Sequence, residues 1–449
     1  MNKKKWALLL SCAVLVFGYI KLFYKTYSVN AVAKNADCIV ALDVKRITNT
    51  LIWNFITSPG QWKTASIATG STKEVSWKDM VKIPDYILAF HVNNQPVNTW
   101  YALLVIKDSN DFVRGLLQYH FENLNANEYV SKDLGIRFFK QGDKVLLTNI
   151  IAGNNNYLAQ VADELFIKKS YVSKAVLEKA IDAKSHLAVY IAANNFLQED
   201  AIITGNFDKQ SIIINSIFTA AGQYSFTESN FGYASGSLCT LGFTQPSAAV
   251  YSLLSDSSKN SISKALGINI DSLFLQSNTY YSLDVAAIKP RVDSAITYTY
   301  DDDFNKVEKA VVNNVLEPAY NFNVIGDSIT TIYNYFVRNN KLDQTDTGQL
   351  FTPMPLVKSY CNIKNEKLLN ISAGNYLAQT TDKNINGIFF LNILLSKIPA
   401  ALLKYLPDGI IKVITNIEWV QLKATKKEKQ LVLNCIVQKK DNDLPVIKL

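Results

Sequence analysis

The sequence predicts an α+β protein that begins with a transmembrane helix and continues as two tandem, duplicated units with mainly antiparallel sheets. Three observations predict this fold class: an apolar run behind an N-terminal lysine cluster, a repeated strand–turn–helix segment, and short strands interspersed with amphipathic helices. The chain has 449 residues, of which 48% are hydrophobic and 19% charged. Two domains, each large enough to bury a core, are therefore expected.

The first 27 residues predict a membrane anchor. Lys3, Lys4 and Lys5 precede an apolar run over 6–24, which is close to the roughly 20 residues that a helix needs to cross a bilayer. Lysines ahead of such a run keep the N-terminus cytoplasmic. We therefore expect a single-pass inner-membrane protein whose C-terminal part lies in the periplasm or extracytoplasmic space. The residues assigned to the anchor are Trp6, Leu10, Val14, Phe17, Ile20 and Tyr24.

Two processing alternatives stay open for this segment. A signal peptidase could cleave after residues 31–33, Ala-Val-Ala, although the charged stretch before that site is long for a cleavage region. Cys12, in the sequence Leu-Leu-Ser-Cys, could instead be the acylated residue of a lipoprotein.

The net charge of +8 does not indicate a nucleic-acid-binding protein. Five lysines fall in the first 27 residues, which contain no acidic residue, and this leaves +3 for the remaining chain. Bidentate phosphate recognition depends on clustered arginines, and the arginines here are scattered. They are Arg46, Arg114, Arg137, Arg291 and Arg338.

An internal duplication organises the rest of the chain. Residues 144–160 are echoed by residues 367–379, and both end in Asn-Tyr-Leu-Ala-Gln after a strand-like run and a Gly-Asn turn. Upstream, strand-like 100–107 and 294–300 each enter an acidic segment typical of a helix N-terminus. The predicted parts are an anchor over 1–27, a first repeat over 31–223, a linker or edge strands over 224–244, and a second repeat over 245–449.

Each repeat is predicted to open with a β-α-β-β-α-β order and to end in an extra hairpin. This order favours a ferredoxin-like core, with helices on one face of an antiparallel sheet. In the second repeat, the acidic residues 301–303 and Phe304 are expected to begin a helix. The closing hairpins are expected around 207–214 and 427–433.

Three segments resemble membrane-anchored or lipoprotein-like envelope proteins of unknown function from Bacteroidota-type Gram-negative bacteria. They are NADCIVALDVKRITNTL over 35–51, GIRFFKQGDKVLLTN over 135–149 and IEWVQLKATKKEKQLVLNCIVQ over 417–438. The resemblance is one of pattern and covers most of the extracytoplasmic part. It implies an envelope protein that faces the periplasm. Those families have no established catalytic residues, so none is carried over.

No complete catalytic, metal or cofactor motif occurs in the sequence. The three histidines lack a second ligand at metal-binding spacing. Ser261 and Lys264 match S-x-x-K, in which a lysine one helical turn away could deprotonate a serine, but the partner K-T-G motif is absent. The surrounding NSISKAL is typical of an ordinary capped helix. No catalytic, cofactor-binding or metal-binding residue is therefore assigned.

The cysteines beyond Cys12 leave their redox state open. In an oxidising compartment four could pair, but each lies in an apolar strand-like run, where a buried free thiol is equally expected. These are Cys38, Cys239, Cys361 and Cys435.

The sequence favours a non-enzymatic envelope protein with a binding or scaffold role. Its expected partners are the membrane, through the N-terminal helix, and either an envelope protein or a small ligand in the cleft between the repeats. The alternative is a serine hydrolase that acts on envelope material, with Ser261 and Lys264 as its candidate residues.

Overall fold

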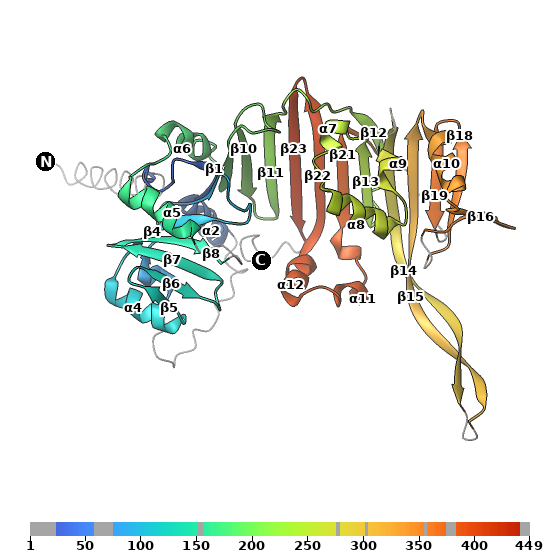
Figure 1. The fold of residues 1–449 in the computed structure, drawn as a ribbon, viewed down its shortest axis with the longest axis horizontal. Helices are drawn as coiled ribbons and strands as arrows, with labels where there is room; N and C mark the ends of the chain where they lie inside the picture. The colour runs from blue at the N-terminus through green and yellow to red at the C-terminus, as the bar shows by residue number, and fades with distance from the viewer. Residues whose placement is uncertain are drawn as a thin grey trace, which may run out of the picture. The chain divides into compact units, whose positions relative to one another are not determined.

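The structure is a computed structural model that describes residues 24–57, 75–150, 156–274, 279–300, 304–353, 357–373 and 383–440. The chain divides into two compact units, with the boundary between Phe218 and Thr219. Unit 1 precedes this boundary and unit 2 follows it, and each is described by itself (Figure 1).

Unit 1 is an antiparallel sheet with helices. Its strands are β1 (Ala36–Asp43), β2 (Val81–Lys82), β3 (Tyr86–Val92), β4 (Tyr101–Ile106), β5 (Glu122–Asn125), β6 (Glu128–Ser131), β7 (Ile136–Gln141), β8 (Lys144–Asn149), β9 (Leu187–Ile191), β10 (Ala201–Phe207) and β11 (Ser211–Thr219). Its helices are α2 (Val44–Thr57), α3 (Trp77–Met80), α4 (Ser109–Gln118), α5 (Tyr157–Ala162), the π-helix η2 (Asp163–Ile167) and α6 (Lys174–Ile181). The strand order is β11-β10-β9-β1-β3-β4-β8-β7-β6-β5, with β2 also paired to β4.

Helix α4 begins where the sequence predicts. The Asp108 carboxylate accepts hydrogen bonds from the backbone N–H groups of Asn110 and Asp111, at 2.8 and 2.9 Å. These bonds satisfy donors that the first helical turn leaves unpaired. Phe112 and Leu116, one turn apart on α4, are then buried against the sheet.

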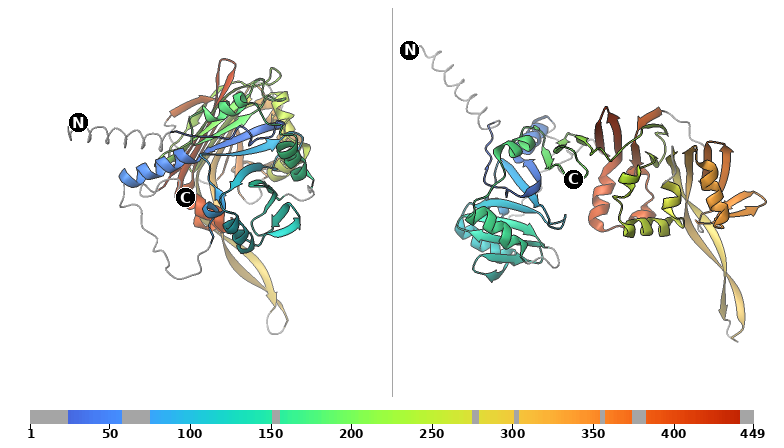
Figure 2. Two further views of the ribbon diagram at one scale, coloured as in Figure 1. Left: turned by 90° about the vertical axis from the view of Figure 1, so that its left-hand side faces the viewer. Right: turned by 45° about the horizontal axis from the view of Figure 1, so that its top comes forward.

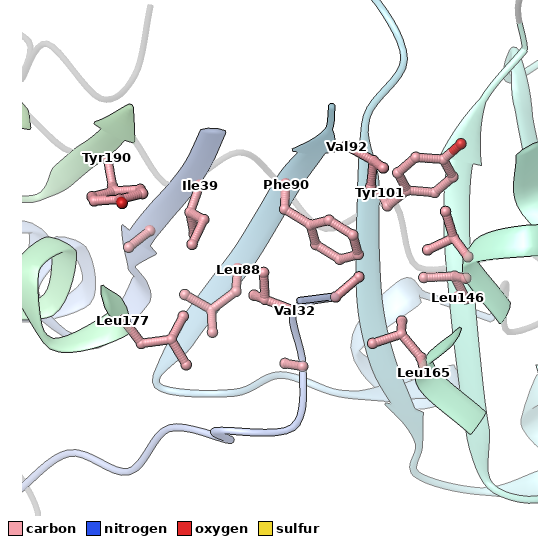
Figure 3. Packing of buried hydrophobic residues seen from close by; sticks show 14 of the residues in the cluster. Val32, Ile39, Leu88, Phe90, Val92, Tyr101, Leu146, Leu165, Leu177 and Tyr190 are labelled. Atoms are coloured by element: carbon pink, nitrogen blue, oxygen red, sulfur yellow. The ribbon is translucent and has the colours of Figure 1, made fainter. Parts of the chain in front are cut away.

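The larger core of unit 1 is filled by side chains from its sheet and helices (Figure 3). Ile39, Phe90 and Tyr101 come from β1, β3 and β4 and lie side by side, since the register pairs Ile39 with Phe90 and Phe90 with Tyr101. Leu165 from η2 and Leu177 from α6 pack in the same core. All five side chains are at most 1% exposed.

Unit 2 has its own antiparallel sheet and a small two-stranded one. Its strands are β12 (Ser229–Tyr233), β13 (Cys239–Thr244), β14 (Thr279–Tyr300), β15 (Lys306–Gly326), β16 (Leu342–Thr345), β17 (Gly348–Phe351), β18 (Ser359–Asn365), β19 (Leu368–Ala373), β20 (Lys383–Gly387), β21 (Phe389–Leu394), β22 (Ile417–Lys427) and β23 (Gln430–Lys439). Its helices are α7 (Ala248–Tyr251), α8 (Asp256–Leu266), α9 (Ile270–Phe274), α10 (Ile329–Arg338), the 3-10 helix η3 (Leu395–Lys397), α11 (Ala400–Leu403) and α12 (Asp408–Asn416).

The main sheet of unit 2 repeats the strand order of unit 1. Its order is β23-β22-β21-β13-β14-β15-β19-β18-β17-β16, and β12 pairs with β20 in the small sheet. Strand β13 therefore corresponds to β1, and the last hairpin, β22–β23, corresponds to β10–β11. The stretch 224–244, predicted as a linker or edge strands, contains β12 and β13.

Two long strands extend the hairpin β14–β15 beyond the main sheet (Figures 1 and 2). Strand β13 pairs with β14 only as far as Val285, and β19 pairs with β15 only up to Tyr320. A bulge at Ala286 follows. Beyond it, residues 287–300 and 306–319 pair with each other, and we call this two-stranded ribbon the arm.

The structure does not bear out the predicted membrane-spanning helix or the inner-membrane localisation. No helix in the described ranges is long and apolar enough to cross a bilayer. Of the anchor residues, Trp6, Leu10, Val14, Phe17 and Ile20 lie outside the described residues.

The described chain begins at Tyr24 with contacts to unit 1. Tyr24 is 66% exposed and lies outside any helix. Lys25 forms an ion pair with the buried Asp43, and the Thr26 N–H donates to Asp85 at 2.8 Å. Lys25 therefore contributes to the fold of unit 1, whereas the prediction placed it at the end of a transmembrane segment.

The predicted ferredoxin-like core is also wrong. In a split β-α-β unit, the strands before and after the helix are parallel and separated by another strand. Here β1 and β3, which flank α2, are direct antiparallel neighbours. The helix predicted after residues 301–303 is strand β15, because its residues Val307, Val311 and Val315 are β-branched and the segment pairs with β14 along its whole length.

Candidate functional site

Unit 2 contains an apolar cavity of about 370 Å³. Cavities that hold small molecules usually measure about 300–1,000 Å³ and have mostly apolar walls. The lining comes from five strands of the main sheet, namely β13, β14, β15, β17 and β19, from α9 and α10, and from the loop before α9. These residues are Leu241, Phe243, Ile268, Leu273, Phe274, Leu283, Val285, Pro318, Tyr320, Phe322, Phe336, Phe351 and Ile371.

The floor of the cavity is a row of side chains across four neighbouring strands. Leu241 on β13 is paired with Leu283 on β14, Leu283 with Phe322 on β15, and Phe322 with Ile371 on β19. Residues that are directly opposite in neighbouring strands project from the same face of a sheet. The period-2 alternation along β13, β14, β15 and β19 therefore builds a continuous apolar surface.

Aromatic side chains from outside these strands form the other walls. Phe274 of α9 contacts Phe243 edge to face, with ring centroids 5.6 Å apart. Phe336 of α10 contacts Phe351 of β17 in the same way at 5.2 Å. Such ring pairs prefer these edge-to-face arrangements, so the walls are held by mutual ring packing.

Tyr320 lines the cavity with its ring, and its hydroxyl forms a hydrogen bond outside the cavity. It donates to the Ser359 Oγ at 2.8 Å, and Ser359 in turn donates to the Val357 carbonyl at 3.0 Å. Burial raises the pKa of Tyr320 above its ordinary value, although the hydrogen bond with Ser359 opposes this shift. Tyr320 therefore stays neutral and offers the cavity only its ring.

Nearby polar groups in the same core are also neutral. Tyr281 is fully buried, its hydroxyl donates to the Leu273 carbonyl, and burial raises the pKa of its phenol. Burial likewise raises the pKa of the Cys361 thiol to about 12, so Cys361 is an inert, protonated side chain. None of the lining residues carries a charge. The arrangement can hold an apolar group, but it offers no nucleophile or acid to act on one.

The leucine-covered core of unit 1 lies on the sheet face opposite to α4, whereas the cavity of unit 2 lies on the face covered by α10, the counterpart of α4. The row Ile39, Phe90 and Tyr101 is covered by Leu165 and Leu177 (Figure 3). Those two leucines come from the connection between β8 and β9, residues 150–186. The corresponding connection in unit 2, between β19 and β21, comprises residues 374–388 and is less than half as long. The two sheets share a strand order, and the length of this connection distinguishes them.

Ser261 and Lys264, the predicted hydrolase pair, lie on α8 as two exposed side chains. Neither is among the cavity-lining residues. The prediction of an ordinary capped helix here is confirmed: the Ser255 Oγ accepts from the Ser258 N–H at 3.2 Å. The hydrolase activity itself stays a prediction.

The described residues hold no group of three or more potential metal ligands among His, Cys, Asp and Glu side chains. Cys38, Cys239, Cys361 and Cys435 are free thiols. Cys12 lies outside the described residues.

Comparison with known proteins gives little further information. No family model matches the sequence, and no curated protein matches it. A solved structure of the protein TP0453 covers 45% of this chain and 82% of its own, with 8% sequence identity and a TM-score of 0.28. This likeness is too weak to indicate fold or function.

Proposed function

We propose that this chain is a non-enzymatic binding protein whose unit 2 holds the apolar part of a small ligand. The observation that supports this proposal is the cavity of about 370 Å³ with uncharged, apolar walls. Each Å² of apolar ligand surface removed from water contributes roughly 25 cal/mol to binding. A charged group inside would lack a partner and would be costly to bury. The ligand is therefore wholly apolar, or an amphiphile whose head group stays outside.

The experiment is a fluorescence titration of the full chain with cis-parinaric acid, an amphiphile whose apolar polyene chain fluoresces more strongly when it leaves water. We expect saturable binding. Leu283→Trp places a larger side chain in the cavity floor and should weaken binding at least tenfold. Ile363→Trp is the matched control, because Ile363 lies on β18 of the same unit, is 46% exposed and does not line the cavity. This variant should bind like the wild type.

Thermal melts of both variants show whether unit 2 stays folded. If Leu283→Trp unfolds it, Leu241→Phe adds less volume to the same floor and takes its place. Absence of probe binding by the wild type, or equal binding by the cavity variant and the wild type, would reject the proposal.

A further inference from the structure

The arm has one apolar and one polar face. Its register pairs Ile288 with Pro318, Ser294 with Val312, and Ile296 with Ala310. Directly paired residues share a face, so one face of the ribbon collects most of its large apolar side chains. We call these residues the apolar strip: Ile288, Pro290, Val292, Ile296, Tyr298, Ala310, Val312, Leu316 and Pro318.

The residues of the opposite face are mainly charged, hydroxyl-bearing or small, but Val307, Val311 and Val315 also lie on it. Arg291 and Glu317 form an ion pair there at 3.6 Å, and Lys289 is exposed beside them. Thr297 and Thr299 continue the same face toward the turn. The arm is therefore amphipathic, like an antiparallel sheet whose apolar face packs on a core while its polar face meets water.

Within the described part of unit 2, no third strand pairs with the arm, and its strip is open to water. Val292 is 67% exposed, Ile296 63% and Val312 64%. A two-stranded ribbon is marginally stable in water without a covered apolar face, and contiguous exposed apolar patches mark interaction sites. The strip is therefore expected to contact an apolar occupant.

The strip continues the wall of the cavity. Pro318 and Tyr320 line the cavity and are alternate residues of β15, so they project from the same face. Pro318 already belongs to the arm, where it faces Ile288. An apolar surface therefore runs from the cavity past the bulge at Ala286 and out along the ribbon, which twists as paired strands do (Figure 1). A surface of this elongated shape fits a hydrocarbon chain better than a compact ring system.

The outer end of the strip has the chemistry of a lipid–water boundary. The Lys306 ammonium lies 4.0 Å from the ring centroid of Tyr298, whose hydroxyl donates to Glu308 at 3.4 Å. Amphipathic aromatic and lysine side chains favour that boundary. The described arm residues 286–300 and 304–319 include four basic and three acidic side chains, so the arm is close to neutral and gains little from a charged surface. The charge balance therefore selects a lipid surface without net charge.

We propose that the apolar strip is the path by which an acyl chain passes from an uncharged lipid surface into the cavity of unit 2. This inference rests on the proposed function and names its ligand class. The arm contacts the lipid with its apolar face, and the chain moves along the strip to Pro318 and the cavity. The step involves no covalent change.

The test measures how fast a fluorescent fatty acid, anthroyloxy-palmitate, transfers from phosphatidylcholine vesicles to the full chain in a stopped-flow instrument. The variant Ile296→Asp with Val312→Asp places two charges on the strip. Its transfer rate should fall at least tenfold, while its affinity for cis-parinaric acid in solution stays within twofold of the wild type. The matched control, Thr297→Asp with Thr299→Asp, places the same charges on the opposite face and should transfer at the wild-type rate.

Equal transfer rates for the strip variant and the control would overturn the inference. A parallel loss of solution affinity and transfer rate would also overturn it. The strip would then help to hold the ligand in the cavity and would not deliver the ligand there. Tyr298→Ser, which adds no charge, repeats the test if the charged variant unfolds. If the wild type fails to bind the probe in solution, the proposed function itself is wrong, and this outcome is distinct from both others.

Discussion

His186 shows how a buried polar side chain is held in unit 1. It is 7% exposed and lies directly before β9. Its Nδ1 accepts from the Phe207 N–H at 3.2 Å, and its Nε2 lies 2.7 Å from the Thr50 Oγ1. An Nδ1 that accepts requires the proton on Nε2, so Nε2 donates to Thr50. In the folded state the imidazole of His186 is therefore neutral.

The stability of unit 1 should fall as the pH drops below about 6.5, the ordinary pKa of histidine. Burial, together with the positive charge of Arg46, lowers the pKa of His186 in the folded state. Above the ordinary pKa both states are neutral; below it, the unfolded chain takes up a proton that the folded unit resists. Urea unfolding at pH 7.5 and 5.0 measures the loss, and His186→Gln should reduce it. An equal loss in the variant would show that other groups cause it.

A methyl group at position 242 should destabilise unit 2. A Cβ there would lie 2.5 Å from the Cγ and 2.6 Å from the Cδ1 of Phe231, which is 1% exposed. Gly242→Ala forces this ring to move, and such overpacking costs about 1–3 kcal/mol. Gly222→Ala is the matched control, because a Cβ at Gly222 meets nothing within 4 Å. Calorimetry compares the two, and equal melting temperatures would contradict the packing at Gly242.

At the scale of elements, an ion pair ties β6 to β7 in unit 1. Glu128 and Arg137 lie on these neighbouring strands, and their side chains are 8% and 15% exposed. Two charges so far from water stabilise each other, but each alone would be left without its counter-charge. Replacing either residue should therefore weaken the pairing of β6 with β7.

Removing one member of this pair should cost more than removing both. Glu128→Gln leaves the Arg137 charge buried, and losses of about 3–5 kcal/mol follow from such single changes. Glu128→Leu combined with Arg137→Met replaces both charges with apolar groups and should recover part of that stability. Urea unfolding of Glu128→Leu, of Arg137→Met and of the double variant closes the thermodynamic cycle. Additive losses would mean that the two side chains do not interact.

The elements differ in how well the sequence predicts them. Helix α4 was predictable because Asp108 caps it locally and Phe112 and Leu116 give it helical spacing. The same acidic signal over 301–303 was misleading, since the segment after it joins a long hairpin and the pairing with β14 overrides the local preference. Local chemistry fixes a helix start, but it does not show whether a distant strand competes for the same residues.

At the scale of the whole molecule, each unit has its own hydrophobic core. One cluster of unit 2 includes Val324, Ile332 and Leu369, and unit 1 has separate clusters around Phe90 and Phe138. Separate cores allow each unit to unfold as its own cooperative transition.

A ligand in the cavity should stabilise only one of two thermal transitions. Cis-parinaric acid at about 100 times its Kd should add about 2.7 kcal/mol to the unfolding free energy of unit 2. Gly242→Ala identifies this transition, because its substitution lies in unit 2. Differential scanning calorimetry with and without the probe provides the measurement. A shift of the other transition, or of neither, would contradict the location of the site.

The duplication could be suspected from Asn-Tyr-Leu-Ala-Gln, whose second copy over 375–379 lies outside the described residues. The cavity could not be predicted. The residues of its floor, Leu241, Leu283, Phe322 and Ile371, read as ordinary core positions, and their row appears only when four strands are placed in register. The volume left above them depends on the side chains that cover the sheet, which periodicity does not reveal.

The two prolines of the arm, Pro290 on β14 and Pro318 on β15, bear on how the protein behaves at high concentration. An unpaired strand edge invites another chain to add to it, which is a common origin of aggregation. A proline has no N–H to donate and interrupts such an edge. Each strand of the arm thus carries one interruption near its root. These interruptions should disfavour edge-to-edge assembly of copies that expose the ribbon in solution.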